Sequence, residues 1–324
     1  MNKAYPRLMY AFATALCFFV NAHDALAAFP EKPIRLIVPF DPGGGTDLLA
    51  RFVGQKLSEV ISQPVIVENK PGAAGTIGVA YTAREKPDGY TLVLVNALAH
   101  TASTNFYPDL SYDAVKSFTP IGAIGTVPYM LVVNPKFPAT GYADFVKVIR
   151  SAPGKFNGAS AGTGSAPHLA LELFKRTVGL DIVHVPYKGS GPALNDVMGG
   201  RVELEFENVA AAPHVKSGKL RAIAVTGKRR RTAFPELPTF AEQGQSDFDV
   251  VGYWGFLAPA GVPADVVSIL NRALVRVVGE PANRAQLNTL GLEAEAGTAD
   301  EYGAILRSES AKWSLLIREA NIKP

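Results

Sequence analysis

Hydrophobic and polar residues along this chain follow two periods, one typical of strands and the other of helices. Short apolar runs rich in β-branched residues predict strands, whereas longer segments with apolar residues three or four positions apart predict helices. Glycine-rich turns separate strands from the helices that follow them. The first part of this pattern predicts strands at 34–40, 65–67 and 90–95, helices at 46–61 and through Ala83, and glycine-rich turns at 41–45 and 72–78.

The same order of elements returns later in the chain. This second part predicts strands at 156–159, 182–185 and 202–206, helices at 166–178 and 189–198, and glycine-rich turns at 160–165 and 189–192. Each part has the strand–helix–strand order of a parallel α/β unit with right-handed crossovers. We therefore expect an α/β protein with two lobes, one built around each part.

Apolar segments outside these two parts predict how the lobes are connected. The strands expected to cross between the lobes lie at 118–133, 220–225 and 250–259, and the helices expected to return to the first lobe lie at 264–278 and 301–319. The expected boundaries are residues 28–126 plus 251–324 for lobe 1 and residues 127–250 for lobe 2.

The first 27 residues have the pattern of a secretory signal peptide. Lys3 and Arg7 precede an uncharged apolar run at 8–20, which is shorter than the roughly 20 residues that a bilayer span needs. A small-x-small site ends at Ala27, so we expect residues 1–27 to be removed there. A retained membrane anchor is the alternative. Cys17 is the only cysteine, so the mature chain must be stabilised by its core without disulfides.

Charge and composition exclude some classes of partner. The net charge is +3, and positive residues cluster only at 228–231, which we interpret as a solvated loop because prolines follow it. Nucleic-acid binding requires a basic face with aromatic side chains for base stacking. The sequence shows no such face, and we predict that the protein does not bind nucleic acid.

The first glycine turn of each part is the candidate for binding a ligand. In open α/β sheets, ligands bind beyond the carboxyl ends of the strands, where these turns lie. Residues 43–45 lead into one predicted helix with Thr46 or Asp47 as its cap, and Gly164 leads into another with Ser165 as its cap. Free backbone N–H groups and the partial positive charge of a helix start attract anions. Two such turns facing each other across a cleft are expected to hold a carboxylate from both sides.

Other kinds of site agree less well with these residues. A single glycine turn is often only a tight connection, and neither turn has the spacing of a P-loop or of a dinucleotide fingerprint. Ser165 and His168 suggest a hydrolase, but no nucleophile elbow surrounds the serine, and a cap with a polar first-turn residue explains the pair. The five histidines show no metal spacing. We predict no catalytic residue, no metal and no cofactor.

Several separate motifs follow one another along the chain: KPIRLIVPFDPGGGTD, QPVIVENKPGAAGTIG, PDGYTL, ASAGTGSAPH, VHVPYKGSGPAL and GFLAPAGVP. In this order they resemble one family, the Bug receptors of tripartite tricarboxylate transporters, and the resemblance covers residues 29–313. It implies a periplasmic solute-binding protein with two α/β lobes of the type II-like periplasmic-binding fold. Each lobe has a mixed sheet flanked by helices, and the ligand cleft lies between the lobes. The implied ligand is a small carboxylate, either an organic acid or an amino acid.

The resemblance also implies which residues contact the ligand. Carried over by motif, they are Phe40, Gly44, Gly45, Thr46 and Asp47 in the first loop, Ala161, Gly164, Ser165 and His168 in the second, Tyr187, Lys188 and Gly189 in the turn PYKG, and Asn208 at a strand end. Ala97, Leu98 and Trp254 are expected at the far end of the ligand. The departures from the family pattern concern Asp41, Glu207 in place of the usual Asp, Glu205, and Ala97-Leu98 where small polar residues are common.

The implied partners are one large and one small integral membrane subunit of the transporter, with the receptor itself a monomer. A component that presents its ligand to a membrane sensor is the first alternative. A hydrolase using Ser165 and His168 is the second alternative.

Overall fold

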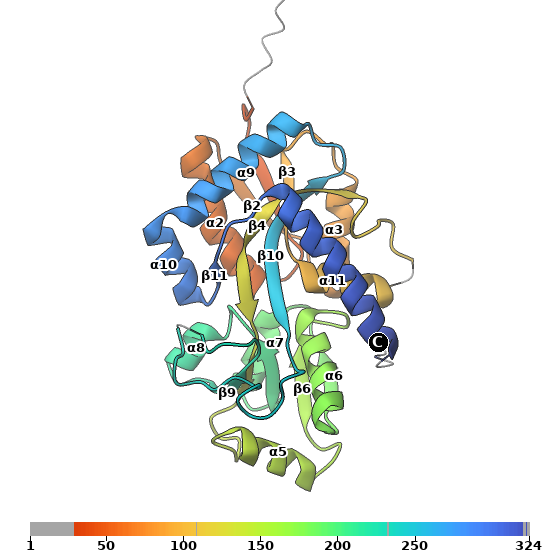
Figure 1. Cartoon of the computed structure of the whole chain (residues 1–324), viewed down its shortest axis with the longest axis vertical. Coiled ribbons are helices and arrows are strands. Elements are labelled where there is room, and N and C mark those ends of the chain that lie inside the picture. The colour runs from red at the N-terminus through yellow and green to blue at the C-terminus, as the bar shows by residue number, and fades with distance from the viewer. Residues whose placement is uncertain (1–28, 108, 232, 320–321, 323–324) are drawn as a thin grey trace, which may run out of the picture.

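The computed structural model describes residues 29–107, 109–231, 233–319 and 322. It has two α/β lobes, one above the other in Figure 1, and two long strands run from the upper lobe towards the lower one. The two-lobed fold expected from the sequence is therefore confirmed. The signal peptide and its cut at Ala27 lie outside the described residues.

The upper lobe, lobe 1, is built on a six-stranded mixed sheet in the order β11-β4-β10-β3-β1-β2. The strand β1 pairs in parallel with both β2 and β3, and β10 pairs antiparallel with β3 and β4. Its strands are β1 (Ile34–Val38), β2 (Val65–Asn69), β3 (Thr91–Asn96), β4 (Phe118–Pro128), β10 (Val251–Pro259) and β11 (Glu293–Ala294).

The helices of lobe 1 cover this sheet with apolar faces. The helix α2 buries Leu49, Val53 and Leu57, which recur every fourth residue and so share one side of the helix. The helices are α2 (Gly45–Ile61), α3 (Thr76–Ala83), α4 (Ala97–Ala102), α9 (Ala264–Gly279), α10 (Pro281–Leu290) and α11 (Ala299–Glu319), with short 3₁₀ turns at Ala73–Gly75 and Ser103–Asn105.

The lower lobe, lobe 2, is built on a five-stranded sheet in the order β7-β6-β8-β5-β9. The strand β6 pairs in parallel with β7 and β8, and β5 pairs antiparallel with β8 and β9. The parallel trio in each sheet confirms the doubled plan. The elements are β5 (Met130–Val133), β6 (Asn157–Ser160), β7 (Val183–Pro186), β8 (Leu204–Glu207), β9 (Arg221–Val225), α5 (Tyr142–Ser151), α6 (Ala166–Val178), α7 (Ser190–Met198) and α8 (Ala212–Lys216).

Two segments cross between the lobes, and they are hydrogen-bonded to each other. The predicted strand at 118–133 is divided into β4 and β5 at Tyr129, which joins one lobe to the other. The Tyr129 N–H donates to Thr226 Oγ1 at 2.7 Å, and the Thr226 N–H donates to the Tyr129 carbonyl at 2.7 Å. Thr226 follows β9 on the return path to β10, so this pair ties the two crossings together.

The apolar core of lobe 2 extends across the contact between the lobes. An aromatic cluster in lobe 2, centred on Phe174, Phe206 and Phe240, forms one contiguous core with Leu98 of α4 and Trp313 of α11. Thus elements of lobe 1 contribute to the core that stabilises lobe 2.

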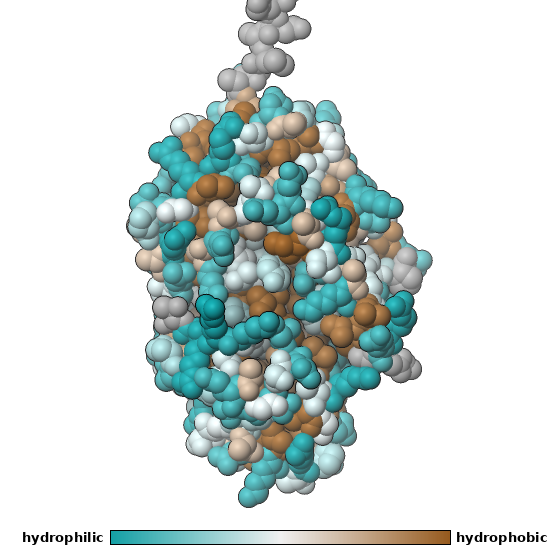
Figure 2. Space-filling model, in the orientation of Figure 1, coloured by the Kyte–Doolittle hydropathy of each residue, from teal (hydrophilic) through white to brown (hydrophobic). Residues whose placement is uncertain are grey.

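The surface seen in Figure 2 is mostly hydrophilic, with hydrophobic areas separated from one another. Within the described residues, the large apolar side chains that are exposed lie on different elements, and no helix has the length and apolarity to cross a bilayer. One sequence interpretation needs correction. Residues 228–230 are exposed as expected, but Arg231 is only 2% exposed and donates to the carbonyl of Gly291 in lobe 1.

Candidate functional site

The carboxyl ends of four strands, β1 and β3 in one lobe and β6 and β8 in the other, meet at a cavity between the lobes. Its volume is about 40 Å³, enough for only a few water molecules because one water needs about 10–15 Å³. Eight of the residues predicted from the sequence line it: Phe40, Gly44, Gly45, Thr46, Ala161, Ser165, Asn208 and Trp254. The cavity thus lies at the strand ends, where ligands bind in open α/β sheets.

The first glycine loop is held in place by Asp47, in the first turn of α2. Asp47 Oδ2 accepts hydrogen bonds from the Gly43 N–H at 3.0 Å and from Arg51 Nε at 3.0 Å, and Asn69 donates to Oδ1. Burial alone would raise the pKa of Asp47, but these hydrogen bonds outweigh it and lower that pKa below its ordinary value. Asp47 is thus an ionised residue that positions the loop.

The second loop is held in the same way by His168, in the first turn of α6. The Gly164 N–H donates to His168 Nδ1 at 3.0 Å, again across four residues. Burial, with the neighbouring His184 and Lys175, lowers the pKa of His168 to about 3, so the ring is neutral and Nδ1 is an acceptor. Ser165 caps α6 by accepting from the His168 N–H. Because Nδ1 is engaged with Gly164, it does not activate Ser165.

Backbones of the two lobes come close beside the cavity. A Cβ atom added to Gly45 would lie 2.9 Å from Asn208 Oδ1 and 3.3 Å from Val209 Cβ, across the seam. One added to Gly189 would lie 3.4 Å from the Asp41 nitrogen. Glycine at these positions therefore permits the two loops to meet.

Three helix N-termini, of α2, α6 and α7, contribute residues to the cavity. No described side chain caps α2 or α7, so first-turn N–H groups of both helices remain available to a ligand. Among the described residues that line the cavity, none carries a cationic side chain. The only carboxyl side chain is that of Glu207. The arrangement favours an anion through backbone dipoles alone.

The remaining predicted residues lie around the cavity without lining it. Gly164 presents its N–H to His168, and Gly189 precedes α7 and packs on Asp41. The Tyr187 hydroxyl donates to Asp196 at 2.7 Å, and Lys188 is exposed. Ala97 and Leu98 are fully buried.

Some lining residues were not predicted from the sequence: Asn96, Ala99, Tyr129 and Ser190. Asn96 Nδ2 donates to the Tyr129 hydroxyl at 2.7 Å, and Asn96 Oδ1 accepts from the Leu98 N–H. A polar residue at the end of the third strand was a signal for Asn96, by the same strand-end rule. Nothing in the local pattern indicated that the crossing at Tyr129 passes the cavity.

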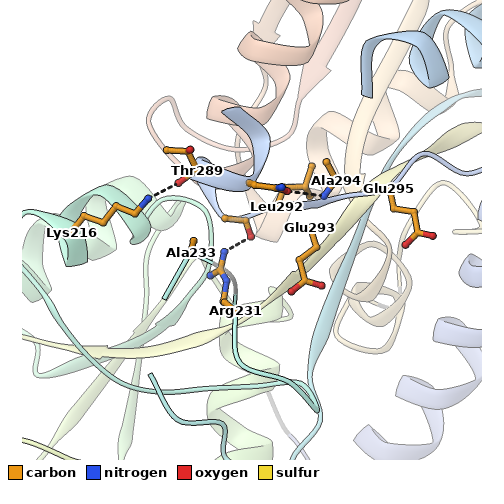
Figure 3. Close-up of a pocket in the computed structure, with 10 residues that line it drawn as sticks. Lys216, Arg231, Ala233, Thr289, Leu292, Glu293, Ala294 and Glu295 are labelled. Atoms are coloured by element: carbon orange, nitrogen blue, oxygen red, sulfur yellow. Dashed lines mark hydrogen bonds between the residues drawn. The ribbon is translucent and has the colours of Figure 1, made fainter. Parts of the chain in front are cut away.

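A second, wider cavity of about 480 Å³ lies where lobe 2 approaches α10 and β11 (Figure 3). Lys216 donates to the Thr289 carbonyl at 3.4 Å, and Arg231 donates to the Gly291 carbonyl. These carbonyls lie at the C-terminal end of α10, where the partial negative charge of the helix favours cations. Glu293 and Glu295 line the same cavity. Its cations are thus engaged in joining the lobes, and the other cavity is the candidate ligand site.

Comparisons with known proteins agree with this geometry. Residues 49–322 match the sequence profile of the family described as "Tripartite tricarboxylate transporter family receptor". The chain is 35% identical over 297 residues to protein BugT of Bordetella pertussis, covering 91% of each chain.

Two solved structures from Rhodopseudomonas palustris are also similar. One, solved with adipate, is 34% identical with a TM-score of 0.88 and covers 91% of this chain and 99% of its own. The other, MatC with bound malate, is 30% identical with a TM-score of 0.84 and covers 89% of this chain and 100% of its own.

Proposed function

Because the chain belongs to the receptor family of the tripartite tricarboxylate transporters, we propose that this periplasmic solute-binding protein captures a small carboxylate, an organic acid or an amino acid, between its lobes. The observation that carries the proposal is the cavity itself, where helix N-termini from both lobes meet and no cationic side chain is found among the described lining residues. Such a site binds carboxylates as a class, because backbone N–H groups recognise the anion and not the rest of the molecule.

We propose different roles for the residues carried over by motif. Those that line the cavity are proposed to touch the ligand, with Trp254 and Asn96 beside its far end. Asp47 and His168 are proposed to position the two loops from behind. Since the cavity of about 40 Å³ holds only a few waters, entry of a small carboxylate requires the lobes to part and then close around it.

Adipate and malate, bound by the two similar structures, are the first ligands to test. We expect one or more acids from a panel of adipate, malate, succinate, glutamate and benzoate to raise the melting temperature of the purified mature protein. At about 100 times the dissociation constant, binding adds about 2.7 kcal/mol to the free energy of unfolding. Absence of a shift with every carboxylate of the panel, while the protein is folded by circular dichroism, would overturn the proposed function.

The protein is proposed to act without catalysis, as a monomer that delivers its ligand to one large and one small membrane subunit. The engagement of His168 Nδ1 with Gly164 supports the absence of a serine–histidine pair. Recovery of the ligand unchanged after incubation, judged by NMR, tests the first point, and cross-linking in membranes tests the partners. Light scattering tests the monomeric state.

Two sequence expectations remain proposals. Cleavage after Ala27 is tested by the mass of the exported protein. The proposed boundaries of the lobes are 28–126 plus 251–324 and 127–250. The membership of the two sheets supports this division, except that β4 of the lobe 1 sheet extends to Pro128. Superposition of open and closed crystal structures tests these boundaries, because each lobe should move as one body.

A further inference from the structure

An acidic side chain lines the cavity in which we expect an anion to bind. Glu207, at the end of β8, is only 2% exposed. Its Oε1 accepts a hydrogen bond from the Asn208 N–H at 2.7 Å, whereas its Oε2 is buried and has no partner among the described residues. A carboxyl oxygen that has no partner and lies at the wall of a ligand cavity is available for a hydrogen bond with the ligand.

The surroundings of Glu207 provide no compensating positive charge. Glu205, two residues earlier on the same face of β8, is fully buried with both oxygens unpartnered. On the neighbouring strand β5, the apolar Met130 pairs with Glu207, and Tyr129 precedes Met130. The helix α7 contributes the Ser190 hydroxyl.

The charged groups on neighbouring elements are already engaged. Asp47 of α2 is paired with Arg51, and His168 of α6 is neutral. Beyond Ser190, Asp196 of α7 is paired with Arg201 and accepts from Tyr187. The arginines on these elements are thus paired with other carboxylates, and no described cation forms an ion pair with Glu207.

Burial raises the pKa of Glu207, and the Asn208 amide and the Ser190 hydroxyl lower it again in part. Burial and the nearby Glu207 raise the pKa of Glu205 well above its ordinary value. An anionic ligand placed beside Glu207 disfavours the ionised form of this side chain further, because two negative charges at short range repel strongly in a buried site.

We propose that Glu207 Oε2 carries a proton and donates a hydrogen bond to the carboxylate of the captured acid, so that capture is linked to protonation. This inference rests on the proposed function and adds to it a specificity-determining residue. A hydrogen bond between a carboxylic acid and a carboxylate is charge-assisted and short. It also explains why an acid is tolerated in a cavity that attracts anions.

The proton balance sets the sign of the pH dependence. When pH is below the pKa of Glu207 in the ligand-free protein, the proton is already present and capture takes up none. Above that pKa, the free protein carries Glu207 ionised, and one proton comes from solvent as the ligand binds. Affinity is therefore constant at low pH and falls by up to tenfold per pH unit above this pKa.

The test is isothermal titration calorimetry with the tightest-binding acid of the panel. Measurements run from about pH 6.5 to about pH 8.5, where ordinary ligand carboxyls with a pKa near 4 remain ionised. Each pH is repeated in phosphate, HEPES and Tris, whose different ionisation heats give the number of protons taken up. For the wild-type protein we expect uptake of up to one proton per ligand and an affinity that falls as pH rises.

Glu207→Gln keeps a donor and removes the titration. We expect this variant to bind with no proton uptake and with an affinity independent of pH, tighter than wild type at the alkaline end. Glu205→Gln is the matched control, because its side chain lies on the same strand face but does not line the cavity. It should retain the proton uptake of the wild type. The melting temperature of each variant shows whether it is folded. The wild-type titration tests the proposal even if a variant does not fold.

Three results separate the hypotheses. Wild-type binding with no proton uptake at any pH, and an affinity that does not change with pH, overturns the proton-linked capture and leaves the receptor function intact. An affinity that rises with pH and is lost in Glu207→Gln also overturns it, because an ionised Glu207 would then pair with a cationic group of the ligand. Failure of every acid to bind overturns the proposed function itself, and the inference with it.

Discussion

At the scale of single residues, backbone position matters more than side-chain charge in this site. Gly43 and Gly164 are each fixed by a side chain four residues later, an ionised Asp47 in one lobe and a neutral His168 in the other. The motifs indicated both side chains, but as ligand contacts, because sequence spacing does not tell whether a side chain points into a cavity or back to its own loop. The same limit applies to Glu207, whose identity was visible while its unpartnered oxygen was not.

Glu205 permits a prediction about stability at this scale. Its carboxyl is buried without a partner, so replacing it by an unbranched apolar side chain should remove a polar group that is costly to bury. We expect Glu205→Met to raise the free energy of unfolding at neutral pH by about 1–3 kcal/mol. Urea unfolding checks this, with the exposed Glu236→Met as the control.

The raised pKa of Glu205 determines how the stability gain of Glu205→Met changes with pH. The folded protein retains a proton that the unfolded chain releases above about pH 4.3, so wild-type stability falls as pH rises towards the raised pKa. The advantage of Glu205→Met should therefore shrink as pH falls to about 4.3. A variant less stable than wild type at neutral pH would contradict the assignment.

At the scale of elements, prediction from sequence was close for several helices with a clear apolar period, although α5, which buries Tyr142, Phe145 and Ile149 on one face, was missed. The helix at 166–178 was predicted with the bounds that α6 has, and α2 begins one residue before the predicted start. The helices α4, α5, α8 and α10 were not predicted. Of these, α4 and α8 are too short for a helical period to be recognised, and α10 buries only Leu287, so no apolar face marks it.

The start of α2 provides a matched pair of variants. A Cβ at Gly45 would meet Asn208 Oδ1 at 2.9 Å, and that oxygen is held by the Val209 N–H. A Cβ at Gly44 meets nothing closer than 3.7 Å. We expect Gly45→Ala to weaken ligand binding at least about tenfold, or about 1.4 kcal/mol, and Gly44→Ala to leave it within about threefold, roughly 0.7 kcal/mol.

Calorimetric titration of both variants measures this difference. Because alanine is a better helix former than glycine by about 0.8–1.0 kcal/mol, Gly45→Ala should not destabilise α2 itself. Equal affinities of the two variants would show that the approach of the lobes at Gly45 is unimportant for capture.

At the scale of the whole molecule, the two lobes share a core. The cluster around Phe174 includes Leu98 from α4 and Trp313 from α11, and Trp313 Nε1 donates to Glu309 at 2.8 Å within α11. The sequence predicted that the last helix returns to lobe 1, and α11 does pack on β4 and α4. Its participation in the core of lobe 2 depends on how the lobes meet, which no local pattern encodes.

A shared core predicts cooperative unfolding of both lobes. The chain has two tryptophans, and each reports a different core, Trp254 that of lobe 1 and Trp313 the shared one. In Trp254→Phe and in Trp313→Phe, we expect urea transitions followed by fluorescence and by far-UV circular dichroism to coincide. Separate midpoints for the two probes in either variant would show that the lobes unfold independently.

The hydrogen-bonded crossing at Tyr129 has a further consequence. Tyr129 lines the cavity and bonds through its backbone to Thr226 in the other crossing segment, so a residue of the proposed ligand site also belongs to the connection between the lobes. The energy of bending this joint enters the binding constant of every ligand alike, whereas the lining side chains discriminate between ligands. Substitutions at Thr226 should therefore tune affinity without altering selectivity, which makes the two properties separately adjustable in a receptor engineered as a biosensor.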